Sequence, residues 1–265
     1  MNLQLKNIQA FLIDIDGTVF TGNKPIEGAI DTLLHLQKLG MPLAFLSNRG
    51  NISRKEAQQK LKRAGLEVKQ EEIILSSYVA ADFLKSYYPS QTAWVFGEQG
   101  LADELEEAGI QLSTEPEKAD WLVVSLHERL TYRDMNNAFR AVKHGARILA
   151  TNSDRSFPRE DGEAIDVAGM LGAIEATTNR RADVIVGKPS HYMAQKALQQ
   201  LGITPERCAI VGDSLGSDIA MGRMFGLKTI LVLTGGTSAK EVEGLDNAPD
   251  YIFPSITYLK DGGKL

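Results

Sequence analysis

Short apolar runs alternate along this chain with segments in which apolar residues recur at helical spacing. In the outer parts of the chain these runs cover residues 10–13, 42–46, 183–186, 208–211 and 228–233. The stretches between them carry helix-spaced apolar residues such as Ile30, Leu33 and Leu34. This alternation predicts β-α-β units and a parallel sheet with helices on both faces. We therefore expect an α/β fold with a doubly wound, Rossmann-like core.

The middle of the chain repeats this alternation separately. Its expected strands are residues 93–96, 121–125 and 147–150. We predict that residues 78–183 form a second, inserted α/β domain, so that residues 1–77 and 184–265 make up one core domain. A chain of 265 residues is long enough for two domains of ordinary size.

Charge and cysteine content limit the partners and the location. Lys and Arg number 29 and Asp and Glu number 34, so the net charge is −5, which argues against nucleic acid or an anionic membrane as partner. No apolar run approaches the ~18–20 residues of a membrane span, and residues 1–6 lack the pattern of a signal peptide. The single cysteine, Cys208, excludes an intrachain disulfide, so a cytoplasmic location is expected. The acidic stretch 103–107 is expected to be a solvated helix face.

Charged and hydroxyl side chains follow the outer apolar runs at the points where these runs end. The sequences there are Asp14-Ile15-Asp16-Gly17-Thr18, Ser47-Asn48, Gly187-Lys188, and Gly212-Asp213 followed by Asp218. Ligands of open parallel sheets bind beyond the carboxyl ends of the strands, so we expect these residues to converge. Carboxylates that converge repel one another unless a cation neutralises them, and Mg²⁺ binds carboxylates together with a substrate phosphate. The pattern predicts a magnesium-dependent site for a phosphoryl group.

The acidic residues suggest a division of roles. Asp14 can attack phosphorus as a nucleophile, and Asp16 can protonate the leaving alkoxide and later activate water. Asp213 is the expected metal ligand, while Asp218 is either a ligand or a residue that holds one. Thr18 is expected to pin the turn after Gly17.

Other residues of the same motifs are suited to binding phosphate. Ser47 can donate a hydroxyl hydrogen bond, and the backbone N–H groups around Asn48 can bind an anion as other turns and helix starts do. Lys188 supplies a fixed positive charge.

These four motifs resemble those of the haloacid-dehalogenase (HAD) superfamily of phosphatases. The stretch Thr151-Asn152-Ser153-Asp154-Arg155 in the inserted segment resembles the α/β cap of the NagD-like branch (class IIA, C2 cap). The resemblance implies Mg²⁺, a phosphoaspartate intermediate and homodimers that contact each other through their caps. It also implies that Asp16 reaches the metal through its backbone carbonyl, so the predicted metal-binding residues are Asp14, Asp16 and Asp213.

The cap adds candidates for contact with the substrate. Asn152, Asp154 and Arg155 are candidates of this kind, and a plain surface turn is the alternative reading of their loop. Residues 45–54 and 154–158 resemble the corresponding stretches of sugar phosphatases. Arg49 and Ser214 differ from many NagD-like members, and this difference affects the shape and charge of the substrate pocket.

We predict an Mg²⁺-dependent phosphatase for small phosphomonoesters, with sugar phosphates as the expected substrates and broad selectivity among them. One alternative is a phosphatase for nucleotide monophosphates or pyridoxal phosphate. Another is a non-enzymatic phospho-receiver or regulatory protein, which would need neither Asp16 as an acid nor an inserted domain. A dehalogenase on this scaffold would have little use for Asp16, Asp213 and a metal. The sequence contains neither Gly-x-Gly-x-x-Gly nor Gly-x4-Gly-Lys-[Ser/Thr], so common nucleotide-binding folds lack support.

Overall fold

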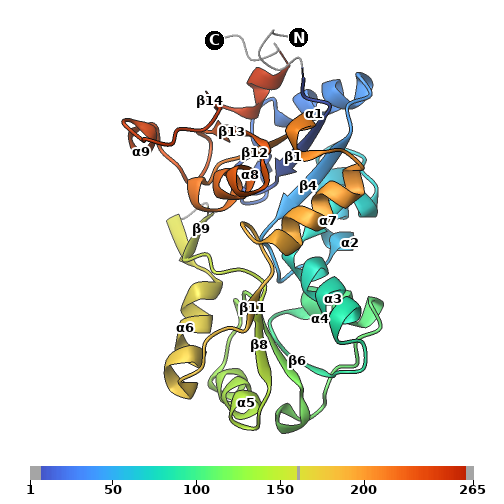
Figure 1. The fold of residues 1–265 in the computed structure, drawn as a ribbon, viewed down its shortest axis with the longest axis vertical. Helices are drawn as coiled ribbons and strands as arrows, with labels where there is room; N and C mark the ends of the chain where they lie inside the picture. The colour runs from blue at the N-terminus through green and yellow to red at the C-terminus, as the bar shows by residue number, and fades with distance from the viewer. Residues whose placement is uncertain (1–6, 160–161, 261–265) are drawn as a thin grey trace.

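The chain forms two parallel β-sheets, one in the upper and one in the lower half of Figure 1. The computed structural model describes residues 7–159 and 162–260, and residues 1–6, for which no signal peptide was predicted, lie outside these ranges. Within the described ranges, no helix combines the length and the apolar character needed to cross a bilayer.

The larger sheet joins the two outer parts of the chain. Its parallel strands lie in the order β14-β13-β12-β1-β4-β5. Their bounds are β1 (Ala10–Asp14), β4 (Leu43–Ser47), β5 (Ile73–Leu75), β12 (Cys208–Gly212), β13 (Lys228–Val232) and β14 (Tyr251–Phe253). Ala10 of β1 pairs with Cys208 of β12, so the two outer parts form one sheet as predicted.

Helices cover both faces of this sheet, which confirms the predicted α/β fold (Figure 1). They are α1 (Ala29–Lys38), α2 (Arg54–Arg63), α3 (Ser76–Tyr87), α7 (His191–Leu201) and α8 (Ala220–Phe225), while the short α9 (Ala239–Val242) has no buried residue. Ala10 and Leu12 of β1 belong to a buried cluster that includes residues of α7 and α8. Phe11 and Ile13 belong to a second cluster, which includes residues of α1 and α2. Successive residues of β1 are therefore buried on opposite faces, as in a sheet with helices on both sides.

Local sequence signals fix several helix ends. The sequence Ser53-Arg54-Lys55-Glu56 has the spacing of a capping box, and this box begins α2, with the Ser53 backbone N donating to Glu56 Oε2 over 2.7 Å. Gly202 ends α7 in the left-handed conformation at φ 62°, where glycine lacks the strain of other residues. The remaining short elements are β2 (Phe20–Thr21), β3 (Lys24–Pro25), a π-helical turn at Leu215–Ile219, and 3₁₀ turns at Gln70–Glu72, Pro116–Lys118, Pro205–Arg207 and Ile256–Leu259.

The smaller sheet lies in the middle of the chain and has the strand order β11-β8-β7-β6, again parallel. Its strands are β6 (Ala93–Phe96), β7 (Trp121–Val124), β8 (Arg147–Ala150) and β11 (Val184–Ile185). The helices of this part are α4 (Gln99–Glu107), α5 (Tyr132–Lys143) and α6 (Val167–Thr178), and an antiparallel hairpin is formed by β9 (Ser156–Arg159) and β10 (Gly162–Ile165). The three strands predicted here are present to within one residue.

The apolar run 183–186 differs from its prediction as a strand of the larger sheet. It forms β11, which pairs with β8 at the edge of the smaller sheet, with Val184 opposite Leu149. A short apolar run fits either sheet, and the sequence does not say which neighbour it pairs with. The predicted division into a core of 1–77 and 184–265 and an insert of 78–183 stays a prediction, and its second boundary falls on this strand.

The two halves share a buried junction. One apolar cluster contains Leu12 and Leu46 of the larger sheet and Trp121 of the smaller one. Glu104 of α4, which was expected on a solvated face, is only 1% exposed. Its Oε1 accepts a hydrogen bond of 2.6 Å from the backbone N of Arg54 at the start of α2. The prediction of a solvated face is wrong for Glu104, because its carboxylate is buried in a hydrogen bond that joins α4 to α2.

Candidate active site

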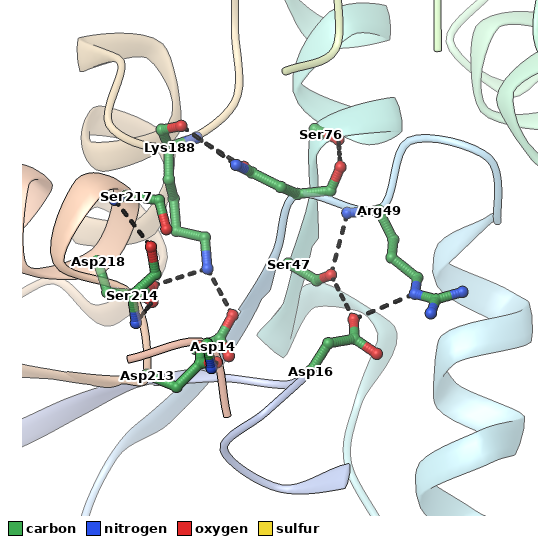
Figure 2. Close-up of polar contacts among 12 residues, drawn as sticks. Asp14, Asp16, Ser47, Arg49, Ser76, Lys188, Asp213, Ser214, Ser217 and Asp218 are labelled. Atoms are coloured by element: carbon green, nitrogen blue, oxygen red, sulfur yellow. Dashed lines mark hydrogen bonds and ion pairs between the residues drawn. The ribbon is translucent and has the colours of Figure 1, made fainter. Parts of the chain in front are cut away.

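The predicted motif residues meet where three adjacent strands of the larger sheet end. Asp14 is the last residue of β1, Ser47 is the last residue of β4, and Asp213 follows β12 directly. The side chains of Asp14, Asp213 and Lys188 lie close together in Figure 2. A cavity of about 450 Å³ opens at these strand ends. Both halves of the chain contribute to its lining, which includes Asp14, Asp16, Ser47, Asn48, Arg49, Asp154, Arg155, Phe157, Asp166, Lys188, Asp213, Ser214 and Asp218.

Lys188 bridges two buried carboxylates. Its Nζ lies 2.5 Å from Asp14 Oδ1 and 2.7 Å from Asp218 Oδ1, and all three side chains are almost fully buried. Burial alone lowers the pKa of Lys188, but the negative charges of Asp14 and Asp218 outweigh burial and raise it. Lys188 is therefore charged at neutral pH and holds one oxygen of Asp14 in place.

Three carboxylates gather around this lysine. One oxygen from each of Asp14, Asp213 and Asp218 lies within 4.8 Å of the others. Burial raises the pKa of Asp14, and Asp218 and Asp213 raise it further against the opposing effect of Lys188. Burial, together with Asp218, raises the pKa of Asp213 to about 6. Neighbouring carboxylates that resist ionisation in this way are typical of a site that a cation neutralises.

The donor set fits a hard divalent cation. Asp14 Oδ2 is buried and has no hydrogen-bond partner among the described residues. Asp213 Oδ2 accepts a hydrogen bond of 2.5 Å from the Gly236 N–H, and Gly17 packs so closely against this carboxylate that a Cβ atom would clash with it. Carboxylate oxygens are the ligands that hard cations such as Mg²⁺ prefer. The carboxylate cluster includes Asp218, whereas the predicted set named Asp16 beside Asp14 and Asp213.

The side chain of Asp16 lies outside that cluster and has partners of its own (Figure 2). Ser47 Oγ donates to Asp16 Oδ2 over 3.0 Å, and Arg49 Nε lies 3.3 Å from the same oxygen. Lys60 Nζ of α2 lies 3.5 Å from Asp16 Oδ1. Burial raises the pKa of Asp16, but Arg49 and Lys60 outweigh burial and lower it. This placement agrees with a metal contact through the backbone carbonyl of Asp16, in which the carboxylate does not bind the metal. That contact stays a prediction.

The turn after β1 is held differently from the prediction. Gly17 adopts φ 89°, a conformation that favours glycine. Thr18 was expected to pin this turn, but its Oγ1 is buried with no hydrogen-bond partner among the described residues. Thr234, after β13, donates instead from Oγ1 to the Gly17 carbonyl over 2.6 Å. The supporting role predicted for Thr18 is therefore corrected, because the hydroxyl that holds the turn comes from the segment after β13.

Asn48 links the two halves at the edge of the cavity. Its Nδ2 donates to Asp154 Oδ2 over 2.7 Å, and its Oδ1 accepts from the Lys188 backbone N over 2.7 Å. Gly187 lies so near Asn48 that a Cβ atom at this glycine would collide with the amide oxygen. The amide side chain of Asn48 thus orients the segment that carries Lys188, in addition to the phosphate contact predicted for its backbone.

The predicted cap residues divide into two groups. Asp154 and Arg155 line the cavity. Asn152 is outside the lining and only 1% exposed, with Nδ2 donating to the Asn48 carbonyl over 2.8 Å and Oδ1 accepting from the Asp154 backbone N over 2.9 Å. Both ends of this amide are used in the junction, which corrects the expectation that Asn152 contacts the substrate.

Several lining residues were not among the predicted site residues. The guanidinium carbon of Arg49 lies 5.3 Å from the centroid of the Phe157 ring in β9, so Arg49 joins Asp16 to the hairpin. Asp166 lines the cavity and caps α6, with Oδ1 accepting from the Val167 backbone N over 2.7 Å. The departure at Arg49 from the NagD-like pattern and the aspartate directly before a helical stretch are the sequence signals that point to these residues.

Comparison with known proteins gives a consistent result. A family model for the haloacid dehalogenase-like hydrolases matches residues 11–111, and a HAD hydrolase-like model matches residues 185–259. Sugar-phosphatase AraL of Bacillus subtilis is 55% identical over 254 residues, which cover 96% of this chain and 92% of that protein.

Solved structures agree over a similar extent. A p-nitrophenyl phosphatase from Archaeoglobus fulgidus matches with a TM-score of 0.90 and 35% identity over 96% of this chain and 99% of the other. NagD from Escherichia coli matches with a TM-score of 0.83 and 30% identity over 94% of this chain and 97% of the other. With such similarity over almost its whole length, the chain belongs to the haloacid dehalogenase-like hydrolases and, within them, to the NagD-like branch.

Proposed function

We propose that this protein is a Mg²⁺-dependent phosphatase that hydrolyses small phosphomonoesters, with sugar phosphates as its main substrates. One observation carries the proposal: Asp14 has one carboxylate oxygen held by Lys188, while the other is buried without a partner at the cavity. A carboxylate fixed at one oxygen and free at the other is arranged as a nucleophile.

In the first step, Asp14 Oδ2 attacks phosphorus and the bond from phosphorus to the ester oxygen breaks. Asp16 must be protonated for this step, in spite of its lowered pKa, and gives that proton to the departing alkoxide. Lys188 and the Ser47 hydroxyl balance negative charge on the phosphoryl oxygens, together with backbone N–H groups around Asn48. The products of this step are the free alcohol and a phosphoaspartate at Asp14.

In the second step, water attacks phosphorus while Asp16 accepts one of its protons. The bond from phosphorus to Asp14 breaks, and inorganic phosphate leaves. Asp14 and Asp213 would hold the cation with the backbone carbonyl of Asp16, and Asp218 holds Lys188 in place. The bound cation supplies positive charge that neutralises the carboxylates and the phosphoryl oxygens.

The substrate class rests on the relatives and on the cavity. The 55% identical relative carries the name sugar-phosphatase, and others that cover nearly the whole chain are named acid sugar phosphatases. The cavity of about 450 Å³ has room for a small phosphorylated metabolite. Polar side chains such as Asp154, Arg155 and Ser156 line it. These features favour broad selectivity among small phosphosugars.

The alternatives predict different outcomes. A phosphatase for nucleotide monophosphates or pyridoxal phosphate would show its highest kcat/KM with those compounds. A phospho-receiver would keep its phosphoryl group for long periods and would not turn over. Asp16 at the cavity, within reach of a leaving group, favours an enzyme over a receiver.

Partners and location belong to the same proposal. We infer a small phosphorylated metabolite as the ligand and no nucleic acid or membrane partner, and a homodimer formed through the cap. The single cysteine, Cys208, is buried, and burial raises its pKa to about 12. A chain with one cysteine can form no intrachain disulfide, which suits the reducing cytoplasm in which we expect the protein.

A screen of phosphate release tests the proposal. Purified protein with Mg²⁺ is assayed against sugar phosphates, nucleotide monophosphates, pyridoxal phosphate and p-nitrophenyl phosphate, with Asp14→Asn protein as the blank. We expect sugar phosphates to give the highest kcat/KM among the metabolites. Higher values for nucleotides or pyridoxal phosphate would support that alternative, and no release from any ester would contradict the enzyme.

A further inference from the structure

Two carboxylates from the middle of the chain line the same cavity as Asp14. Asp154 lies in the loop after β8, and Asp166 caps the N-terminus of α6. The Ala168 N–H donates to the Asp154 carbonyl over 3.0 Å, and the Asp166 N–H donates to the Arg155 carbonyl over 3.0 Å. These bonds fix the two segments side by side. We call Asp154 and Asp166 the acidic wall.

The negative charge of the acidic wall opposes the binding of an anionic phosphate ester. Burial raises the pKa of Asp154, and burial together with the charge of Asp154 raises the pKa of Asp166 to about 6. With a pKa of about 6, Asp166 is ionised at pH 7.5 against the charge of Asp154 beside it. Negative charge in a cavity that takes an anionic ester weakens the binding of that ester. Such a cost points to a compensating contact with another part of the substrate.

Lys188 and Arg49 lower the pKa values of Asp154 and Asp166 respectively, but their ion pairs are formed with other carboxylates. Lys188 bridges Asp14 and Asp218. Arg49 lies 3.3 Å from Asp16, and Arg155 is exposed, so solvent screens its charge. The direct partner of Asp154 is the neutral amide of Asn48. The acidic wall therefore keeps a net negative charge.

An independent feature shows that this cavity is built for a ligand. Asp14 is 4% exposed, and its Oδ2 has no hydrogen-bond partner among the described residues while Asp14 lines the same cavity. A ligand that reaches Asp14 with its phosphoryl group extends into a space that Asp154 and Asp166 also border. The acidic wall can therefore select the remainder of the ester.

Resting on the phosphatase function above, we propose that Asp166, with Asp154 beside it, is a specificity-determining residue that favours esters with a neutral polyol remainder and rejects those with a second anionic group. An ionised carboxylate is only an acceptor of hydrogen bonds, and sugar hydroxyls are donors. A carboxylate or second phosphate at the same place would meet like charge. Selection by attraction and by repulsion thus comes from the same two residues.

The test compares substrates that differ in one charge. We would measure kcat/KM with Mg²⁺ for glycerol 3-phosphate against 3-phosphoglycerate, and for glucose 6-phosphate against 6-phosphogluconate, with p-nitrophenyl phosphate as a reporter of the chemistry. The proteins are wild type, Asp166→Asn and Asp166→Ser. Both variants keep a side chain that can cap α6, so the helix start is retained.

Asp183→Asn is the matched control. Asp183 Oδ2 also accepts a backbone hydrogen bond, from Ile148 over 2.8 Å, but this residue lies outside the cavity lining. We expect wild type to prefer the neutral member of each pair. In Asp166→Asn the neutral member should become slower and the anionic member faster, so that their ratio falls by about ten-fold, and Asp183→Asn should leave the ratio unchanged.

Opposite changes for the two members distinguish a specificity role from a structural one. If wild type hydrolyses p-nitrophenyl phosphate but shows no preference within the pairs, the inference is overturned and the phosphatase stands. Equal losses for both members in Asp166→Asn and Asp166→Ser would likewise leave Asp166 as a helix cap only. If no ester is hydrolysed, p-nitrophenyl phosphate included, the proposed function fails and the inference fails with it.

Discussion

Asp14 and Asp16 lie two residues apart, yet their carboxylates have different partners: Lys188 Nζ lies 2.5 Å from Asp14, whereas Ser47 Oγ lies 3.0 Å from Asp16. Their surroundings shift the two pKa values in opposite directions. Burial raises the pKa of Asp14, although the charge of Lys188 opposes this shift. The charges of Arg49 and Lys60 outweigh burial at Asp16 and lower its pKa. The lowered pKa of Asp16 favours its ionised form, which is the form that accepts a proton from water in the second step of the proposed reaction.

Replacing the proposed nucleophile should abolish turnover. Asp14→Asn keeps the size of the side chain but removes the attacking carboxylate, so we expect phosphate release to fall by at least about 10³-fold. Circular dichroism should show an intact fold. Mass spectrometry of acid-quenched wild type with substrate should detect a phosphoryl-enzyme that the variant lacks. Activity retained in Asp14→Asn would show that another residue attacks phosphorus.

The role of Asp16 can be tested through the leaving group. Asp16→Asn cannot donate a proton, and alkoxides need protonation far more than phenolates do. We expect kcat for alkyl phosphates to fall by about 10²–10⁴-fold, and kcat for p-nitrophenyl phosphate to fall much less. Phosphate release measured with both classes of ester checks this. Equal losses for both would count against proton transfer by Asp16.

The larger features of the fold were predictable because they depend on local pattern. Apolar runs are buried on both faces of a parallel sheet, and capping residues such as Ser53 act within one helical turn. The strand with which a two-residue edge strand pairs was not predictable. Val184 pairs with Leu149 through contacts that the run itself does not encode. Burial of Glu104 likewise depends on Arg54, which lies in a distant part of the sequence.

The site was predictable to the extent that strand ends converge. Asp14, Lys188 and Asp213 were predictable because each follows an apolar run. Contacts that cross between elements were not, such as the hydrogen bond from Thr234 to the Gly17 carbonyl. The place of Asn152 was not predictable either, since a polar loop residue has the same sequence pattern whether it faces a ligand or a buried junction.

Removing the cation should stop the reaction and lower stability. EDTA should abolish phosphate release and Mg²⁺ should restore it. A ligand that binds only the folded state stabilises it by about 2.7 kcal/mol at a hundred times its Kd, so Mg²⁺ should raise the Tm of wild type. Asp213→Asn should lose this response. Asp250→Asn is the control, since Asp250 accepts a backbone hydrogen bond from Thr229 over 2.9 Å outside the cavity. Activity that EDTA does not change would contradict the proposed dependence of the reaction on a metal ion.

The turn after β1 gives a pair of opposite stability effects. Thr18 Oγ1 is buried without a partner among the described residues, so Thr18→Val removes a desolvated hydroxyl and should leave stability unchanged or raise it by about 1 kcal/mol. Thr234→Val removes the donor to the Gly17 carbonyl and should cost about 1 kcal/mol. Urea unfolding of both variants checks the difference. If Thr18→Val lowered the free energy of unfolding and Thr234→Val did not, Thr18 would have the supporting role first expected for it.

Asp166 should make the protein less stable as the pH rises. Its pKa is raised from 3.8 to about 6 in the folded protein, by burial first, so the folded state binds its proton more tightly than the unfolded state does. The stabilisation present below pH 3.8 is therefore lost as the pH rises through about 6. Asp166→Asn keeps the cap of α6 and does not titrate, so at pH 7.5 it should be about 1–3 kcal/mol more stable than wild type.

The same comparison at low pH completes this test. At pH 4 wild type holds the proton on Asp166 in its folded state, so the advantage of Asp166→Asn should nearly vanish. Urea unfolding of both proteins across this pH range measures the difference between them, in which the carboxylates that do not interact with Asp166 cancel. A variant that gains stability while losing its preference for neutral polyol esters would show that the carboxylate is kept for selectivity at a cost in stability. A difference between the two proteins that does not change with pH would refute the raised pKa of Asp166 and leave only its effect on the helix cap.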